Sequence, residues 1–271
     1  MPESVKTLLS IAGSDPLGGA GIQADIRSGI LMGFHVATAV TAVTAQNSHG
    51  LSDLGVIPSY LLKDQLASIL QDVTPDAVKI GMIGSLENMR VVIDFLHSVY
   101  SRIPVVIDPV LKSSAGNREL SKDEIPEMID LYRNELFPLT TVLTPNIEEY
   151  GQLFPNAVLS EEESDRFDTR ELNCNSVIIT GATRNQDSVS DILVYKGDVT
   201  SITHKRVDCH NLHGTGCVFS SVLACFLGEG NNVPVAFSLT SAKMNEIILR
   251  SCDHSLGVST YGPLNINNYN L

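Results

Sequence analysis

Short apolar runs alternate along the chain with segments in which apolar residues recur at the spacing of a helix. The apolar runs predict six strands, at residues 7–13, 36–45, 76–82, 103–110, 140–146 and 176–181. The periodic segments predict seven helices, at residues 22–32, 59–72, 85–100, 123–136, 148–153, 217–227 and 234–253. Residues 191–207 alternate polar with apolar side chains, which is typical of a β-hairpin.

This order of elements predicts an α/β fold in which helices cover both faces of a mostly parallel sheet. Polar residues follow several predicted strands at their C-terminal ends, among them Asp15, Gln46, Asp108 and Asn146. In open α/β sheets ligands bind at that edge, so we expect the functional site there.

Length and composition fit one compact domain. No linker, charge block or internal repeat divides the 271 residues, so we expect a single domain over residues 1–271. The start of the chain has no apolar stretch long enough for a signal peptide. The longest weakly polar run, residues 30–45, is interrupted by His35, so no membrane partner is expected. The five cysteines contain no C-x-x-C pair, which favours a reducing compartment, and we expect a cytoplasmic protein.

The formal net charge is −13. A surface this acidic repels phosphate backbones, so nucleic acid is not an expected partner. Any anionic ligand must then be bound by local donors, such as helix N-termini, backbone N–H groups and a few cationic side chains.

The loop after the first predicted strand, GSDPLGGAGIQAD (residues 13–25), is rich in glycine. It does not fit a dinucleotide-binding fingerprint, because Asp15, Pro16 and Leu17 separate the glycines from the strand and the second strand ends without a carboxylate. The sequence also has no G-x-x-x-x-G-K-[ST] phosphate loop. Two interpretations stay open: a plain glycine turn, or a backbone against which a small flat ligand can lie.

Oxygen-bearing side chains follow two of the later strands. Asp108 comes directly after one buried strand, and Asn146 and Glu149 follow the next. Such residues often serve only as caps or turn formers. Two neighbouring strands that present oxygen ligands to one crevice also fit Mg²⁺ held together with substrate phosphates.

The stretch HGTGC before the sixth predicted helix places Gly214, Thr215, Gly216 and Cys217 where one polar cap would suffice. Glycines leave the first N–H groups of the helix open, and these donors together with the helix dipole predict an anion site. The position is also expected to lower the pKa of the Cys217 thiol. The alternative is a flexible turn with Cys217 as a small packed residue.

Six motifs, in this order and spacing, carry a family resemblance: IAGSDPLGGAGIQADI, TAVTAQNSHG, KIGMIGS, VVIDPVL, LTPNIEE and HGTGCVFSSVLACFL. Together they resemble the hydroxymethylpyrimidine/phosphomethylpyrimidine kinases of thiamine biosynthesis, which belong to the ribokinase-like group. The resemblance spans nearly the whole chain. It implies a three-layer α/β/α sandwich, ATP as phosphoryl donor, Mg²⁺ as cofactor and an anion hole at residues 214–217. It also implies a pyrimidine pocket formed by Gly13, Ala20, Asp25, Gln46, Met82 and Val110.

One position departs from the family. Members commonly have a lysine where this chain has Thr180. A cation for the ATP phosphates could then come from Lys112, Arg184 or Lys243. The departure leaves two alternatives open: a pyridoxal or pyridoxine kinase, and a pyrimidine-binding sensor without turnover.

The resemblance thus implies a kinase that phosphorylates 4-amino-5-hydroxymethyl-2-methylpyrimidine and then its monophosphate. The position of Cys217 at a helix N-terminus makes its thiolate the expected general base for the alcohol. The polar segment AQNSHGLSD (residues 45–53) is expected to be a loop that orders over the ligand. A homo-oligomer, most simply a dimer, is expected because such assemblies are common.

Overall fold

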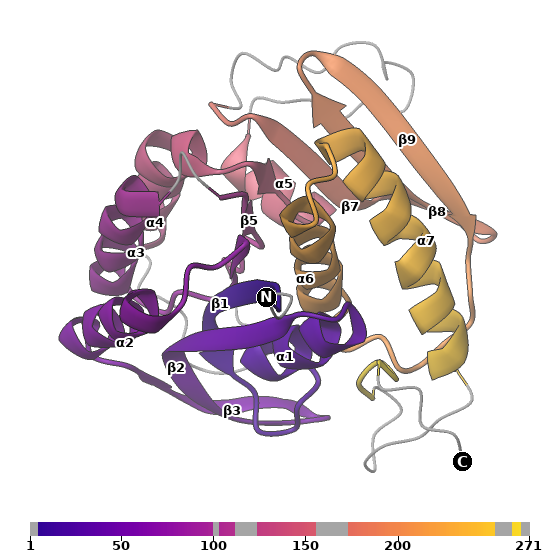
Figure 1. Cartoon of the computed structure of the whole chain (residues 1–271). Coiled ribbons are helices and arrows are strands. Elements are labelled where there is room, and N and C mark those ends of the chain that lie inside the picture. The colour runs from indigo at the N-terminus through magenta and orange to yellow at the C-terminus, as the bar shows by residue number, and fades with distance from the viewer. Residues whose placement is uncertain (1–4, 100–102, 112–123, 156–172, 253–261, 267–271) are drawn as a thin grey trace.

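A nine-stranded sheet forms the centre of the molecule (Figure 1). The computed structural model describes residues 5–99, 103–111, 124–155, 173–252 and 262–266. The strands lie in the order β3-β2-β1-β4-β5-β6-β7-β8-β9. Their bounds are β1 Thr7–Ser14, β2 His35–Asn47, β3 Gly50–Val56, β4 Ala77–Ile80, β5 Val105–Ile107, β6 Val142–Leu143, β7 Ser176–Arg184, β8 Ser188–Tyr195 and β9 Asp198–Lys205.

Strands β2, β1, β4, β5, β6 and β7 are neighbours in this order and pair in parallel. Strand β3 pairs antiparallel with β2 at one side of the sheet, and β8 and β9 add antiparallel pairs at the other. The mostly parallel sheet and the hairpin of β8 and β9 are therefore confirmed. The helices are α1 Gly21–Leu31, α2 Ser59–Asp72, α3 Leu86–Val99, α4 Glu124–Leu131, α5 Ile147–Leu153, α6 Thr215–Gly228 and α7 Val233–Ser251.

Helices cover both faces of the sheet because its central strands are apolar on both sides. In β1, Leu9 and Ile11 pack into one core with residues of α2, α3, α4 and α5. Leu8, which precedes Leu9, points to the other face and packs with residues of α1, α6 and α7. These are the outer layers of the expected α/β/α sandwich, with α2 and α3 on one side of the sheet and α6 and α7 on the other (Figure 1).

Residues 50–56 correct the sequence interpretation: they form strand β3 rather than a loop. The segment lacks the apolar alternation of a buried strand because β3 lies at the edge of the sheet and is largely exposed. Its pairing with β2 rests on backbone hydrogen bonds, which polar residues and glycine can also make.

Two central strands are shorter than predicted. Strands β5 and β6 end at Ile107 and Leu143, before Asp108 and Asn146. These two residues keep only single backbone contacts with the sheet: the Asp108 N–H donates to Ile80, and Asn146 forms an isolated parallel bridge with Thr180. Helix α4 ends at Leu131 and continues as a π turn to Leu136. The early ends of β5 and β6 leave their polar residues free to line a cavity.

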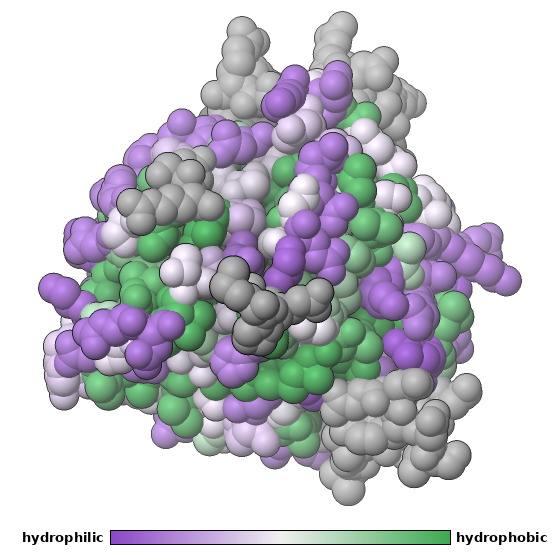
Figure 2. All heavy atoms as spheres, in the orientation of Figure 1, coloured by the Kyte–Doolittle hydropathy of each residue, from purple (hydrophilic) through white to green (hydrophobic). Residues whose placement is uncertain are grey.

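The surface mixes hydrophilic with hydrophobic residues (Figure 2). Exposed apolar side chains such as Ile30, Tyr60 and Leu249 come from different helices, as is ordinary for a folded protein. None of the helices described is both long and apolar enough to cross a membrane. The five cysteines are all free thiols. A single domain, a cytoplasmic location and a homo-oligomer stay predictions.

Candidate active site

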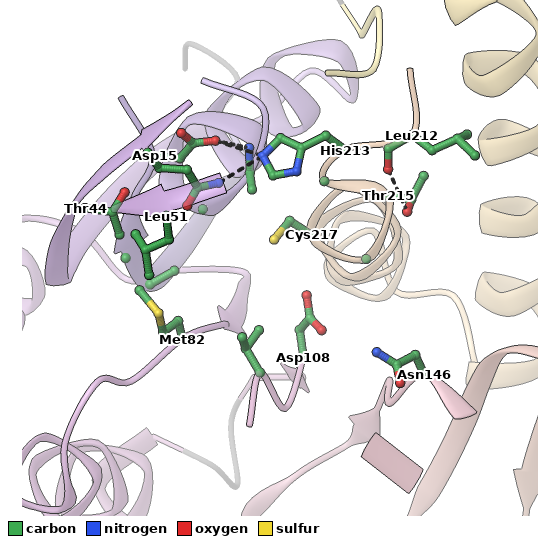
Figure 3. A pocket seen from close by; sticks show the side chains of 18 of the residues that line it. Asp15, Thr44, Leu51, Met82, Asp108, Asn146, Leu212, His213, Thr215 and Cys217 are labelled. Atoms are coloured by element: carbon green, nitrogen blue, oxygen red, sulfur yellow. Dashed lines mark hydrogen bonds and ion pairs between the residues drawn. The ribbon is translucent and has the colours of Figure 1, made fainter. Parts of the chain in front are cut away.

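A cavity of about 450 Å³ lies at the C-terminal ends of the parallel strands, at the edge of the sheet where the sequence predicted a site. It brings together most of the predicted residues, from the C-terminal ends of the parallel strands and the start of α6 (Figure 3). The predicted residues that line it are Gly13, Ala20, Gln46, Met82, Asp108, Val110, Asn146, Glu149, Thr180, Gly214, Thr215, Gly216 and Cys217.

Glycines at the cavity allow two loops to touch backbone to backbone. Gly214 has φ +85°, and a Cβ there would overlap the carbonyl oxygen of Gly19. Gly21 has φ +57°, and a Cβ there would overlap the carbonyl oxygen of Gly13. A plain turn would need only one such residue, so the glycines hold the loop of residues 13–21 against the start of α6.

Helix α6 begins at the cavity without a side-chain cap, because its N-cap residue is Gly214. The Thr215 N–H donates back to the carbonyl of Leu212, and the Val218 N–H donates to Gly214. The N–H groups of Gly216 and Cys217 belong to the first turn, which has no carbonyl partners within the helix. Together with the helix dipole, they are the donors of the predicted anion site, which stays a prediction.

Two carboxylates, Asp108 and Glu149, also line the cavity, and Asp108 lies against the first turn of α6, where a Cβ at Gly216 would be 3.6 Å from Oδ2. Asp108 is only 5% exposed, and burial raises its pKa. Burial and the charge of Asp108 raise the pKa of Glu149 to about 8. A cation between these groups would relieve their desolvation and mutual repulsion, so this pair fits Mg²⁺. Within the described part of the chain, no group of three or more His, Cys, Asp or Glu side chains could hold a metal, so other ligands would be water and phosphate oxygens.

Asn146 and Glu149 also form a capping box at the start of α5. The Asn146 side chain accepts from the backbone N–H groups of Glu148 and Glu149, and Glu149 Oε2 accepts from the Asn146 N–H at 3.0 Å. The interpretation of these residues as helix caps is therefore confirmed. Because the box fixes the Glu149 side chain toward the cavity, the cap also positions a candidate ligand.

The expected low pKa of Cys217 is wrong. Burial is the largest influence, and together with the carboxylates of Asp108 and Asp25 it raises the pKa of the thiol to about 12, against the opposing charge of Lys79. The thiol and the Asp108 carboxylate point into the same space (Figure 3). Cys217 is therefore a neutral thiol near a carboxylate at neutral pH.

Asp25 does not line the cavity, contrary to the prediction. It is fully buried on α1, where Lys79 Nζ donates to both of its carboxylate oxygens at 2.8 and 3.0 Å. Ser10 and Ser221 donate to the same carboxylate. These contacts use Asp25 to join α1, β1, β4 and α6 beneath the cavity floor. Lys79 itself lines the cavity, and the sequence interpretation missed it.

Asp15 and His213 are also cavity residues. The sequence interpretation placed Asp15 at the ligand-binding edge of the sheet without a specific role, and it gave His213 none. The Asp15 carboxylate accepts the N–H groups of Leu17, Gly19 and Ala20. It also lies 3.3 Å from His213 Nε2, which in turn lies 3.1 Å from Gln46 Nε2 (Figure 3). Both residues stand within quoted motifs, so their signal was present but indistinguishable from turn formation.

A second cavity of about 400 Å³ adjoins the first. Both are lined by Thr180, Leu212, Thr215 and Gly216, so the start of α6 belongs to both. The second cavity also contains several basic side chains and one carboxylate, contributed by Arg184, His204, Lys205, Arg206 and Asp191.

The three candidate cations fall in different places. Arg184 lines the second cavity. Lys243 lines neither cavity and instead forms an ion pair with Glu246 at 2.8 Å on the exposed side of α7, so its proposed role with ATP is not supported. Lys112 lies outside the described residues.

Comparison with known proteins agrees with this geometry. The chain is 35% identical over 237 residues to the hydroxymethylpyrimidine/phosphomethylpyrimidine kinase of Streptomyces coelicolor, covering 87% of this chain and 86% of that protein. It is 35% identical over 263 residues to the thiamine biosynthesis multifunctional protein ThiED of Corynebacterium efficiens, covering 95% of this chain and 34% of that protein. The chain thus spans a third to a half of the length of such multifunctional relatives.

Among solved structures, the pyridoxal kinase of Staphylococcus aureus in complex with AMP-PCP and pyridoxal superposes with a TM-score of 0.80 at 26% identity, covering 98% of this chain and 96% of that one. The expected ribokinase-like fold is confirmed. The model of the phosphomethylpyrimidine kinase family matches residues 15–265, and the chain belongs to that family.

Proposed function

We propose that this chain acts as one Mg²⁺-dependent kinase domain that transfers a phosphoryl group from ATP to 4-amino-5-hydroxymethyl-2-methylpyrimidine and to its monophosphate. The observation that carries the proposal is the pair of adjoining cavities that share the N-terminus of α6. A phosphoryl group in transit between two ligands needs such a shared anion site.

The charges of the two cavities support a different ligand in each. The second cavity carries the basic side chains Arg184, Lys205 and Arg206 in a chain whose formal charge is −13, so it suits the polyphosphate of a nucleotide. The first cavity contains the carboxylates of Asp15, Asp108 and Glu149, so it suits a neutral ring beside a divalent cation. The complex of the S. aureus relative with AMP-PCP and pyridoxal supports two ligands in one such fold.

The lining of the first cavity suits a small flat heterocycle. Gly13 and Ala20 expose backbone on one side, and Met82 and Val110 add apolar contact. Gln46 supplies an amide that can donate to a ring nitrogen or accept from an exocyclic amine. The expected roles of these residues as pyrimidine ligands are part of this proposal.

In the proposed reaction the hydroxymethyl oxygen attacks the γ-phosphorus, the bond to the bridging oxygen breaks and ADP leaves. The N–H groups of Gly216 and Cys217 stabilise the charge on the transferred group. Asp108 and Glu149 would hold Mg²⁺, which would supply neutralisation of the phosphate charge. The alcohol proton passes to the Cys217 sulfur while the thiol proton passes to the Asp108 carboxylate, so no free thiolate is required.

A pyridoxal or pyridoxine kinase is a second candidate, because the S. aureus structure that shares this fold is a pyridoxal kinase. An ADP-release assay with the aminopyrimidine alcohol, its monophosphate, pyridoxal and pyridoxine separates the candidates. We expect the two pyrimidines to have the highest kcat/KM. A kcat/KM for pyridoxal more than about tenfold higher would assign the second candidate. Pyrimidine binding without turnover of any substrate would leave only the sensor.

A further inference from the structure

The side chain of Arg184 folds back over the backbone at the end of β7. Its guanidinium lies so close to Gly181 that a Cβ there would be 2.6 Å from one terminal nitrogen and 2.7 Å from Nε. Gly181 also has φ +58°, which disfavours other residues. The absence of a side chain at position 181 therefore makes room for the guanidinium, which lines the second cavity.

The guanidinium of Arg184 makes no hydrogen bond or ion pair with any residue that the structure describes. The nearby carboxylate of Asp191 makes a hydrogen bond with the backbone instead: its Oδ1 accepts the Gly181 N–H at 2.7 Å. By contrast, Arg206 donates to the carbonyl of Asn185, and Lys243 pairs with Glu246. The exposed Arg184 side chain thus lines the cavity with N–H donors that have no acceptor among the described residues.

Arg184 also lies beside the junction of the two cavities. Gly181, which the guanidinium covers, directly follows Thr180, and Thr180 lines both cavities. The Thr180 hydroxyl brings no positive charge there and instead approaches the carbonyl of Pro145 at 3.4 Å. The transferred phosphoryl group would occupy this junction, so the guanidinium is near the terminal phosphates rather than the base of a nucleotide.

We propose that Arg184 binds the terminal phosphates of the donor nucleotide and supplies the positive charge that Thr180 lacks. The inference rests on the proposed function, because it requires a nucleoside triphosphate in the second cavity. A planar guanidinium suits two phosphate oxygens at once.

Calorimetry with the non-hydrolysable nucleotide AMP-PCP and Mg²⁺ tests the proposal without turnover. Arg184→Gln should weaken AMP-PCP binding about 10- to 100-fold, as loss of charge-assisted hydrogen bonds does, and leave binding of the aminopyrimidine alcohol unchanged. Lys243→Gln removes a cation from the neighbouring surface and is the matched control, expected to bind like the wild type.

A second variant separates phosphate binding from packing. Thr180→Lys in the Arg184→Gln background should restore a large part of the AMP-PCP affinity, because it returns a cation to the same junction. Unchanged AMP-PCP affinity in Arg184→Gln would overturn the proposal, as would equal weakening of nucleotide and pyrimidine binding. If the wild type binds no AMP-PCP, the proposed function itself fails; if the wild type is an active kinase and only the Arg184 results disagree, that function stands.

Discussion

The Cys217 thiol lies at the N-terminus of α6 and near the carboxylate of Asp108. The helix N-terminus favours a low pKa of the thiol, whereas the carboxylate raises it. Burial and the nearby carboxylates dominate, so the pKa rises to about 12. A general base with this pKa would be almost entirely protonated at neutral pH, which favours the relay to Asp108 over a free thiolate.

Cys217→Ala tests the relay, because it removes the thiol and keeps the backbone N–H. We expect kcat to fall about 100-fold with the aminopyrimidine alcohol, within the usual range for proton transfer. The loss should be much smaller with the monophosphate, since its second pKa of about 6 leaves it largely ionised at pH 7. Steady-state kinetics with both substrates measures the difference. Equal losses in the two reactions would mean that the thiol serves packing or the shared transition state.

Glu149 couples stability to pH. Its pKa in the folded protein, about 8, lies above the ordinary value of 4.5, so folding retains a proton on Glu149 between these pH values. Its contribution to stability is therefore lost as pH rises through this window. Glu149→Gln should raise the melting temperature relative to wild type at about pH 9 and change it little at about pH 4. Thermal melts without Mg²⁺ measure this; Glu87→Gln, at an exposed position on α3, is the control. A difference that does not grow with pH would contradict the assignment.

At the scale of elements, the hairpin of β2 and β3 covers one side of the first cavity. Backbone pairs such as Thr44 with Leu54 and Gln46 with Leu51 hold it in place without a ligand. We now expect amide hydrogen exchange to be slow for residues 51–56 in the ligand-free protein, and ligand to slow exchange only at the turn around Ser48 and His49. If residues 51–56 exchange rapidly without ligand and slowly with pyrimidine, the earlier expectation of a loop that orders over the ligand is correct instead.

The buried pair of Asp25 and Lys79 joins the elements beneath the cavity. Asp25→Ala would leave the Lys79 charge buried without its partner, which costs about 3–5 kcal/mol of unfolding free energy. Glu127→Ala breaks the exposed pair with Arg90, where the side chains are 51% and 57% exposed, and should cost less than about 1 kcal/mol. Urea denaturation compares the two. If Asp25→Ala instead unfolds like wild type but raises the KM of the pyrimidine, Asp25 is a ligand after all.

The sequence predicts best what is repeated and apolar. The buried strands and the helices that flank them follow from hydrophobic pattern, and the edge to which Asp108 and Glu149 are brought follows from parallel topology. Strand β3 is not predicted by the hydrophobic pattern, because its pairing depends on backbone groups. The direction in which Asp25 points, and the balance of charges that keeps Cys217 protonated, depend on residues distant in the chain and emerge only from the folded structure.

At the scale of the whole molecule, an acidic chain keeps a local basic cavity. The formal charge of −13 should repel ATP at long range, while Arg184, Lys205 and Arg206 attract it nearby. We expect the KM of ATP to change strongly as ionic strength rises from about 0.05 to about 0.3 M, because salt screens these exposed charges. The KM of the uncharged pyrimidine alcohol should change little. Equal salt dependence of the two KM values would contradict the assignment of the cavities.

The wall that the two cavities share has a consequence for inhibition. Thr180, Thr215 and Gly216 line both cavities, so the two cavities adjoin at the start of α6. A single molecule that tethers the pyrimidine to adenosine through a chain of phosphates could fill both cavities at once. Once one end is bound, the other is presented at an effective concentration of about millimolar, so the tethered compound should bind far more tightly than either half alone.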